Sequence, residues 1–321
     1  MSGRPNLGSS PLPCPTATLQ DYAEHVARAL ARSRVWVMYG GIGDQVLHLS
    51  WLPAALRLGE DLVILTTPES EPLARLFPFS DFVPTTYAVL NAELVRGRPW
   101  RSSTNRSPVL CWHHSYDPGG ENRAAHTGQS VLDLIRENLG VPRGTPPLAP
   151  RAPRVGADAI RRSRLALLVP GAHTIGRALP AAYWEGLARH LVSLGYSVML
   201  NGGGATRAFD RVYEERREIE GVRRGAADLT EAFTLASQCA LVVGTHSGFM
   251  TLVARLPGVR KVVLYPHSGE INPILHANQS FWSQRYCFPE EDIHELDVDI
   301  REPPNQSRAA EWWRVVLEDL R

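Results

Sequence analysis

The sequence predicts a two-domain α/β protein with a parallel sheet in each domain. Short apolar runs alternate with stretches whose apolar residues recur at helical spacing, and they do so in both halves of the chain. A segment rich in proline and arginine, residues 142–155, separates the halves and predicts a linker. The length of 321 residues suits two domains of ordinary size. Strand–helix alternation of this kind favours parallel sheets with right-handed crossovers.

The first half begins with a tail over residues 1–17, whose proline, serine and glycine content predicts disorder. A domain over residues 18–141 follows. Apolar runs predict its strands, and amphipathic stretches predict its helices. The expected order is a helix over 19–32, a strand over 35–39, a helix over 46–58, a strand over 62–65, a helix over 69–76, a strand within 108–113 and a helix over 126–139.

The second half, residues 156–302, repeats the alternation. Its expected strands cover 165–169, 197–200, 241–243 and 262–264, and its expected helices cover 181–194, 228–236 and 248–256. Two prolines then interrupt the chain before a last helix over 307–320. We expect the C-terminal segment, residues 303–321, to pack back on the first domain.

The composition narrows the class of function. The net charge of +1, from 34 basic and 33 acidic residues, argues against a nucleic-acid-binding protein. Small arginine clusters, such as Arg216 with Arg217, fit either a solvated surface or a patch for an anionic membrane face or an acidic acceptor. The 4 cysteines form no Cys-x-x-Cys pair, which argues against a zinc site and a disulfide framework. Cysteines that stay reduced are typical of a cytoplasmic protein.

The N-terminal residues lack the apolar core of a signal peptide. No apolar run approaches the roughly 20 residues that a membrane-spanning helix needs. We therefore expect a cytoplasmic protein, either fully soluble or peripheral at the inner membrane face.

Glycines follow the first predicted strand, in the motif Gly40-Gly-Ile-Gly-Asp44. Glycine lets backbone approach a ligand, and the helix start offers free N–H groups. A dinucleotide fingerprint would need a glycine where Val46 stands and an acidic residue where Thr66-Thr67 ends the second strand, so an NAD site is disfavoured. Asp44 fits either a capping carboxylate or a general base at the mouth between the domains.

A second glycine-bearing loop begins at Pro170-Gly171, after a predicted strand. It carries His173, Thr174 and Arg177, whose side chains are suited to donate to phosphate oxygens. An exposed loop with a solvated arginine is the alternative interpretation.

A third loop, Thr245-His246-Ser247-Gly248, leads from a strand into a helix. Its small residues leave backbone N–H groups for an anion, although an ordinary turn would have the same pattern. All three loops follow the carboxyl ends of strands, where α/β sheets bind ligands. A ligand held between two sheets explains the three loops together.

The order and spacing of these motifs resemble glycosyltransferase family 9, the ADP-heptose:lipopolysaccharide heptosyltransferases. The resemblance extends over residues 35–268. It rests on Gly43-Asp-Gln-Val-Leu-His48 with Leu52-Pro-Ala-Ala-Leu56, the helix over 126–139, Pro170-Gly-Ala with Arg177-Ala-Leu-Pro180, Leu200-Asn-Gly-Gly203, the stretch from Leu229 to Gly248, and Tyr265-Pro-His-Ser268.

The resemblance implies a GT-B fold, in which two Rossmann-like domains with parallel sheets face a central cleft. It also implies a bacterial, cytoplasmic, inverting transferase with no cofactor and no metal, and the chain has no Asp-x-Asp motif of the metal-dependent type. The donor would be a nucleotide-diphosphate sugar, with ADP as one candidate nucleotide. The acceptor would be a lipopolysaccharide-like molecule, a small molecule or a glycan.

Site residues follow from the same resemblance. Asp44 corresponds to the catalytic carboxylate of the family, and Arg177 to its pyrophosphate-contacting lysine. The expected donor-binding residues are Pro170, Gly171, His173, Thr174, Gly202, Gly203, Thr245, His246, Ser247 and Gly248. The expected acceptor-side residues are Gly41, Gly43, His48 and His113.

Two positions depart from the family pattern. His246 stands where the family has an aspartate, and Thr251 stands where it has a histidine. The donor sugar could therefore be the heptose typical of the family, a different heptose or a hexose. Two further interpretations remain: a nucleotide-sugar epimerase of the same fold, which would act without acceptor, and a non-catalytic nucleotide-sugar-binding relative.

Overall fold

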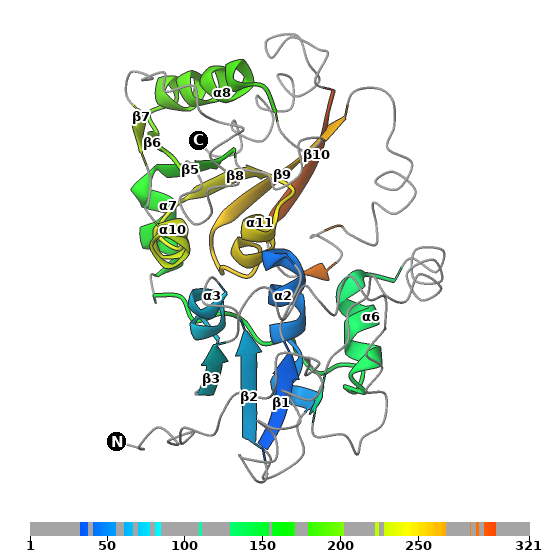
Figure 1. Cartoon of the computed structure of the whole chain (residues 1–321). Helices are drawn as coiled ribbons and strands as arrows, with labels where there is room; N and C mark the ends of the chain where they lie inside the picture. Colours follow the sequence, from blue (N-terminus) through cyan, green and yellow to red (C-terminus); the bar gives the residue numbers. More distant parts are fainter. Residues whose placement is uncertain are drawn as a thin grey trace, which may run out of the picture.

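A computed structural model of the chain describes fourteen stretches of it: residues 33–37, 41–55, 61–66, 70–77, 81–84, 109–110, 129–153, 156–170, 179–201, 222–224, 228–267, 283, 287–288 and 292–299. These residues form two parallel sheets, one in each half of the chain, with helices packed on them (Figure 1). The predicted α/β class with parallel sheets is confirmed. The expected tail over 1–17, the helix over 19–32 and the last helix over 307–320 lie outside the described residues.

The first sheet has the strand order β3-β2-β1-β4, and its strands pair in parallel. Its strands are β1 (Ser33–Val37), β2 (Asp61–Thr66), β3 (Asp81–Pro84) and β4 (Val109–Leu110). The helices of this half are α2 (Ile42–Leu49), the 3₁₀ turn η1 (Leu52–Ala55), α3 (Glu71–Arg75) and α6 (Val131–Asn138). The carboxyl ends of β1, β2 and β3 point toward the second half (Figure 1).

The second sheet has the strand order β10-β9-β8-β5-β6-β7, again with parallel pairing. Its strands are β5 (Leu165–Val169), β6 (Ser197–Leu200), β7 (Val222–Arg224), β8 (Leu241–Thr245), β9 (Arg260–His267) and β10 (Ile293–Asp299). Chain order reverses between β5 and β8. Ligands of open parallel sheets bind at the carboxyl ends of strands beside such a reversal.

The helices of the second half cover both faces of its sheet. They are α7 (Ala157–Ser163), α8 (Ala181–Ser193), α10 (Leu229–Ala236) and α11 (Gly248–Val253). Successive residues of β5 alternate between two apolar clusters, as the pleat of a strand requires. One cluster contains Leu168 and Trp184 of α8. The other contains Leu167 and Phe233 of α10 and faces the first half of the molecule (Figure 1).

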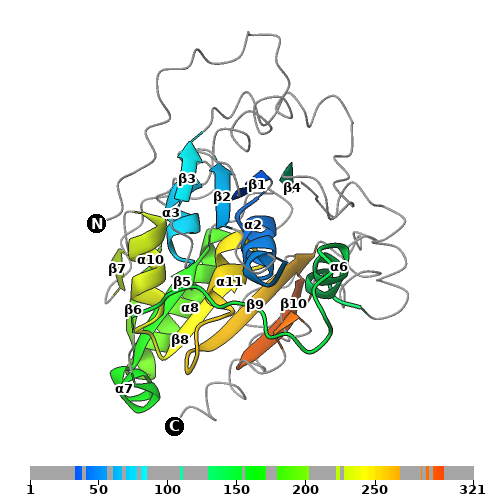
Figure 2. The same cartoon turned by 90° about the horizontal axis from the view of Figure 1, so that it is seen from below.

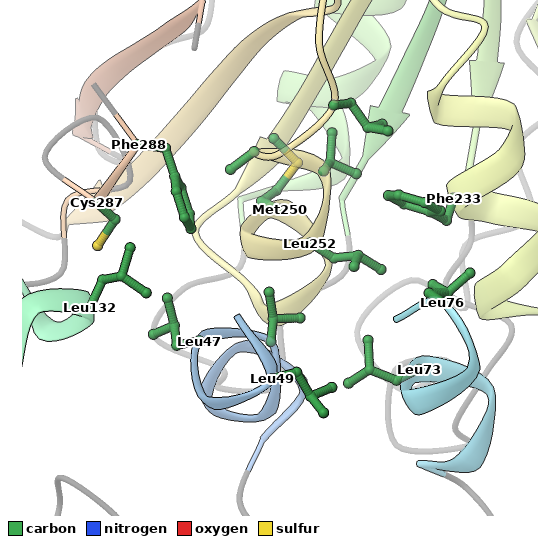
Figure 3. Packing of buried hydrophobic residues seen from close by; sticks show 14 of the residues in the cluster. Leu47, Leu49, Leu73, Leu76, Leu132, Phe233, Met250, Leu252, Cys287 and Phe288 are labelled. Carbon is green, nitrogen blue, oxygen red and sulfur yellow. The ribbon is translucent and has the colours of Figure 1, made fainter. Parts of the chain in front are cut away.

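One apolar cluster joins the two halves. Leu47 and Leu49 of α2 and Leu73 of α3 pack in the same cluster as Phe233 of α10 and Leu252 of α11 (Figure 3). The contacts are α2 against α11 and α3 against α10. Burying one leucine side chain stabilises a fold by about 1.5–3 kcal/mol. The halves are therefore held together by an apolar interface and not only by the chain between them.

The chain between the halves is hydrogen-bonded to both. Its Leu148 N–H donates to the Ser50 carbonyl at 2.8 Å, and its Arg151 N–H donates to the Leu76 carbonyl, both in the first half. From the second half, Arg255 donates through Nη2 to the Pro147 carbonyl at 2.9 Å. The described part of the segment predicted as a linker, residues 142–153, is thus fixed at several points.

Two helices begin four or five residues away from the predicted start, whereas α3 and α10 begin within two residues of it. The helix expected over 46–58 begins at Ile42, ends at Leu49 and is followed by the turn η1. The helix expected over 126–139 begins at Val131, because Ser130 is its N-cap and accepts a hydrogen bond from the Asp133 N–H at 3.2 Å. Four elements were not predicted: β3, β7, β10 and α7.

Candidate functional site

Asp44 lies in the first turn of α2, which follows β1. Gly41 is the N-cap, in an extended conformation, and its N–H donates to Asp44 Oδ2 at 3.0 Å. A carboxylate at this position satisfies a backbone donor and interacts favourably with the positive end of the helix dipole. The capping role considered from the sequence is therefore present, and it also fixes the direction of the Asp44 side chain.

His48 lies one helical turn after Asp44. Its Nδ1 is 2.6 Å from the Asp44 backbone carbonyl. Because a carbonyl can only accept, Nδ1 carries the proton in this bond. His48 is buried, with 2% of its surface exposed. We infer that it supports the helix turn that carries Asp44.

The β8–α11 turn holds the third glycine loop. Ser247 is the N-cap of α11, and its Oγ accepts from the Met250 N–H at 3.4 Å. Thr251 Oγ1 donates to the Ser247 carbonyl at 3.2 Å. Thr245, His246 and Ser247 are all buried. These contacts give the turn one defined shape at the carboxyl end of β8.

Two glycines bring these helix starts into contact. A Cβ atom on Gly248 would lie 2.5 Å from the backbone nitrogen of Gly43 and 2.7 Å from Cβ of Ile42. Gly43 directly precedes Asp44, and Gly248 directly follows Ser247. Figures 1 and 2 show α2 and α11 side by side in both views. The two glycines next to the predicted catalytic Asp44 and the predicted phosphate-binding Ser247 thus meet where the two halves touch.

Pro170 lies at the same edge of the second sheet. β5 pairs with β8 so that Val169 is opposite Gly244, which puts Pro170 and Thr245 at neighbouring strand ends. Both are buried. The remaining predicted site residues lie outside the described residues: His113, Gly171, His173, Thr174, Arg177, Gly202 and Gly203.

Asn201, Tyr265 and Glu295 lie near this edge and were not among the predicted site residues. Asn201 follows β6, is 5% exposed, and its Oδ1 has no hydrogen-bond partner within the described stretches. Tyr265 stacks on His246, with ring centroids 5.0 Å apart and an interplanar angle of 20°, and donates a hydrogen bond to Glu295 at 2.7 Å. A polar residue at the carboxyl end of a buried strand is the signal that could have pointed to Asn201.

The described cysteines are unsuited to nucleophilic chemistry. Burial raises the pKa of the Cys239 thiol to about 12, and burial likewise raises the pKa of the Cys287 thiol to about 12. The thiolate, not the thiol, is the nucleophile, so both side chains are inert near neutral pH. Cys287 packs instead beside Leu132 of α6, at the boundary of the halves (Figure 3).

The described stretches contain neither a group of side chains suited to a metal ion nor a helix suited to crossing a membrane. No three histidine, cysteine, aspartate or glutamate side chains gather there in a group that could hold a metal ion. No helix in these stretches combines the length and the apolar composition that crossing a membrane requires.

Comparison with protein families gives one match over more than half of the chain. Residues 120–297 match the sequence profile of glycosyltransferase family 9 (heptosyltransferase). No curated protein sequence matches the chain.

The fold is similar to solved structures of glycosyltransferases. ADP-heptose lipopolysaccharide heptosyltransferase II of E. coli has a TM-score of 0.53 at 14% identity, over 89% of this chain and 99% of that one. A family 9 glycosyltransferase from Veillonella parvula has a TM-score of 0.54 at 14% identity, over 90% and 89%. E. coli heptosyltransferase WaaC with ADP has a TM-score of 0.54 at 12% identity, over 90% and 100%. The GT-B fold class expected from the sequence is confirmed.

Proposed function

The chain belongs to glycosyltransferase family 9, and we propose that it transfers a sugar from a nucleotide-diphosphate sugar to an acceptor hydroxyl. The sugar is a heptose or a hexose. We propose further that the reaction inverts the anomeric carbon and requires no metal. The contact between α2 and α11 carries the proposal. Asp44 and Ser247 flank the two touching glycines, so a general base and a phosphate-binding turn from different halves would share one site.

The reaction is a single displacement. The acceptor oxygen attacks the anomeric carbon while Asp44 takes its proton, and the bond from that carbon to the donor diphosphate breaks. The transition state has oxocarbenium character, as in other glycosyl chemistry. Asp44 suits the role because the Gly41 N–H donates to its Oδ2, which fixes the orientation of the carboxylate at the start of α2.

The leaving diphosphate gains negative charge as the bond breaks. Arg177 and Thr174 are the proposed side-chain donors to it, together with backbone N–H groups near Ser247 and Gly248. Ser247 supports this role because its side chain caps α11 from the buried end of β8. These donors would do the work that a divalent cation does in metal-dependent transferases.

ADP is the first nucleotide to test, because two of the similar solved structures are named for ADP-heptose or ADP. A lipopolysaccharide-like acceptor would bring the enzyme to the inner face of a membrane, whereas a small-molecule or glycan acceptor would not.

The test of the donor site is thermal-shift binding of nucleoside diphosphates and their sugars, with the wild type and Arg177→Ala compared. We expect one nucleotide to stabilise the wild type, since a ligand that binds only the folded state raises its melting temperature. The variant should lose that stabilisation. No stabilisation of the wild type by any nucleotide would contradict the proposal. Turnover of a nucleotide sugar without acceptor would indicate an epimerase.

The test of the base is Asp44→Asn. An amide oxygen can still accept from the Gly41 N–H, so the helix start should stay intact, whereas the amide cannot take a proton. We expect kcat to fall about 10²–10⁴-fold with little change in nucleotide affinity. Steady-state turnover and ADP binding measure the two effects. Unchanged kcat would remove Asp44 from the role of base.

A further inference from the structure

His246 is held by a stacked aromatic ring. Its imidazole lies face to face with the Tyr265 ring, at a centroid distance of 5.0 Å and an interplanar angle of 20°. Both residues are 7% exposed. The Tyr265 ring therefore covers one face of the imidazole.

Tyr265 is in turn held at its hydroxyl. The Tyr265 O–H donates to Glu295 Oε1 at 2.7 Å, and the Ser283 O–H donates to Oε2 of the same carboxylate. Glu295 belongs to β10, at the edge of the sheet, and Tyr265 to β9 beside it. The Tyr265 ring is therefore held by stacking on its face and by a hydrogen bond at its hydroxyl.

The backbone connects this network to the proposed donor site. The His246 N–H donates to the Leu264 carbonyl at 2.9 Å, which ties the β8–α11 turn to β9. The next residue, Ser247, is the N-cap of α11. A chain of contacts thus runs from the sheet edge, through Glu295 and Tyr265, to the turn that meets Gly43.

We infer that Tyr265 and Glu295 are positioning residues that fix the His246 imidazole against the bound donor and so contribute to donor selection. The inference rests on the proposed function, because it assigns His246 to the donor site. Tyr265 and Glu295 act through His246 and do not touch the reacting atoms.

Three variants separate the parts of the network. Tyr265→Leu removes the stacked ring. Tyr265→Phe keeps the ring and removes the hydroxyl, and Glu295→Gln keeps the shape and removes the charge. Val263→Ala is the matched control. Val263 is fully buried two residues earlier on the same face of β9 and pairs with Glu295 across the strands, so this variant reports what a smaller side chain beside the network does while Tyr265 and Glu295 are unchanged.

The first readout needs no ligand. The imidazole carbon-bound protons of His246, assigned with His246→Gln, should show an upfield ring-current shift in the wild-type NMR spectrum. We expect Tyr265→Leu to abolish the shift, Tyr265→Phe and Glu295→Gln to reduce it, and Val263→Ala to preserve it. A shift that persists in Tyr265→Leu overturns the inference.

The second readout is steady-state kinetics. We expect Tyr265→Leu to raise the donor KM about tenfold, which corresponds to a loss of about 1.4 kcal/mol of donor binding. The KM for the acceptor should stay unchanged, and Tyr265→Phe should recover most of the donor KM. A purely structural role would instead lower the active fraction and leave the donor KM as it is in Val263→Ala.

The outcomes distinguish this inference from the proposed function. If the wild type turns over donor and the variants share its donor KM, the positioning role is overturned and the transferase stands. If the wild type neither binds ADP nor turns over any nucleotide sugar, the proposed function fails, and the assignment of the network to a donor site fails with it.

Discussion

Gly248 and Gly43 decide how closely the two halves approach at the site. A Cβ on Gly248 would lie 2.5 Å from a backbone atom of Gly43, a distance that real side chains do not adopt. A Cβ on Gly43 would meet Cα of Gly248 and Oγ1 of Thr251 at 3.3 Å, which is closer than most Cβ contacts but less close than the contact at Gly248. The two glycines therefore differ in how much a methyl group would disturb the contact.

We predict that Gly248→Ala lowers both activity and stability, and that Gly43→Ala has a much smaller effect. The alanine at 248 must push α11 away from α2, and overpacking of this kind costs about 1–3 kcal/mol. The resulting misplacement should reduce kcat/KM roughly 100-fold. Chemical denaturation and turnover measure the two effects. Equal behaviour of the two variants would mean that the glycine contact does not form in solution.

The sequence predicts the individual site residues better than their contact. Glycine and serine after an apolar run are local signals, so Asp44 and Ser247-Gly248 could be assigned to helix starts. That Gly43 touches Gly248 depends on how the two halves pack, which no local pattern contains. The stacking of His246 on Tyr265 was missed for the same reason.

Among the secondary-structure elements, central strands were predicted best. β5 and β6 have the predicted bounds, because each consists mainly of a short apolar run. β10 was missed because it is an edge strand whose apolar residues are interrupted by charged and partly exposed ones, so it contains no continuous apolar run. α2 begins four residues early because glycines were interpreted as a turn, whereas Gly41 caps the helix and Gly43 lies in its first turn.

The pairing of β9 with β10 includes an ionic contact whose strength depends on pH. The hydrogen bond from His294 and the neighbouring Arg260 guanidinium hold the pKa of Asp292 below its ordinary value of 3.8. His294 Nε2 is 3.0 Å from Asp292 Oδ1, and Arg260 donates through Nε to Oδ2 at 3.2 Å. The unfolded chain binds this proton more readily than the folded one, so the contact stabilises the fold above pH 3.8.

We predict that Asp292→Asn lowers the free energy of unfolding at pH 6 and that this loss shrinks as the pH falls below about 4. Below the depressed pKa the wild-type carboxyl is protonated and neutral, as the amide is. The wild type and the variant should then have similar free energies of unfolding. Urea unfolding of both proteins at a series of pH values measures the difference. A loss that is constant between pH 6 and pH 3 would contradict the assignment.

At the scale of the whole molecule, we expect the shared apolar cluster to make the two halves unfold as one cooperative unit. Leu49 of the first half and Leu252 of the second are both fully buried in it (Figure 3). Arg255 adds to the junction, because its guanidinium carbon lies 5.0 Å from the centroid of the Phe288 ring and its Nη2 bonds to Pro147. Removing a side chain from either half should therefore weaken the other half as well.

We predict that Leu49→Ala and Leu252→Ala each lower the stability of the same single unfolding transition, by about 2–5 kcal/mol. Scanning calorimetry measures this, with the ratio of calorimetric to van't Hoff enthalpy as the criterion of one transition. Leu168→Ala, on the face of the second sheet covered by α8, is the control and should shift that transition too. Two transitions, of which Leu49→Ala moves one and Leu252→Ala the other, would show independent halves.

The same cluster has a consequence for synthesis on the ribosome. The apolar face of α2 and α3 leaves the exit tunnel well before the residues that cover it, because α10 and α11 end only at Ala236 and Val253. About 160 residues separate the end of α3 at Arg75 from the end of α10 at Ala236, and about 200 separate the end of α2 at Leu49 from the end of α11 at Val253. At about 5–20 residues per second, these residues take roughly 8–40 s to emerge. For that interval the leucines of α2 and α3 lack the side chains of α10 and α11 that share their cluster. The apolar side chains of α2 and α3 are then available to chaperones that bind apolar segments. We expect folding in the cell to depend on how fast the second half is synthesised.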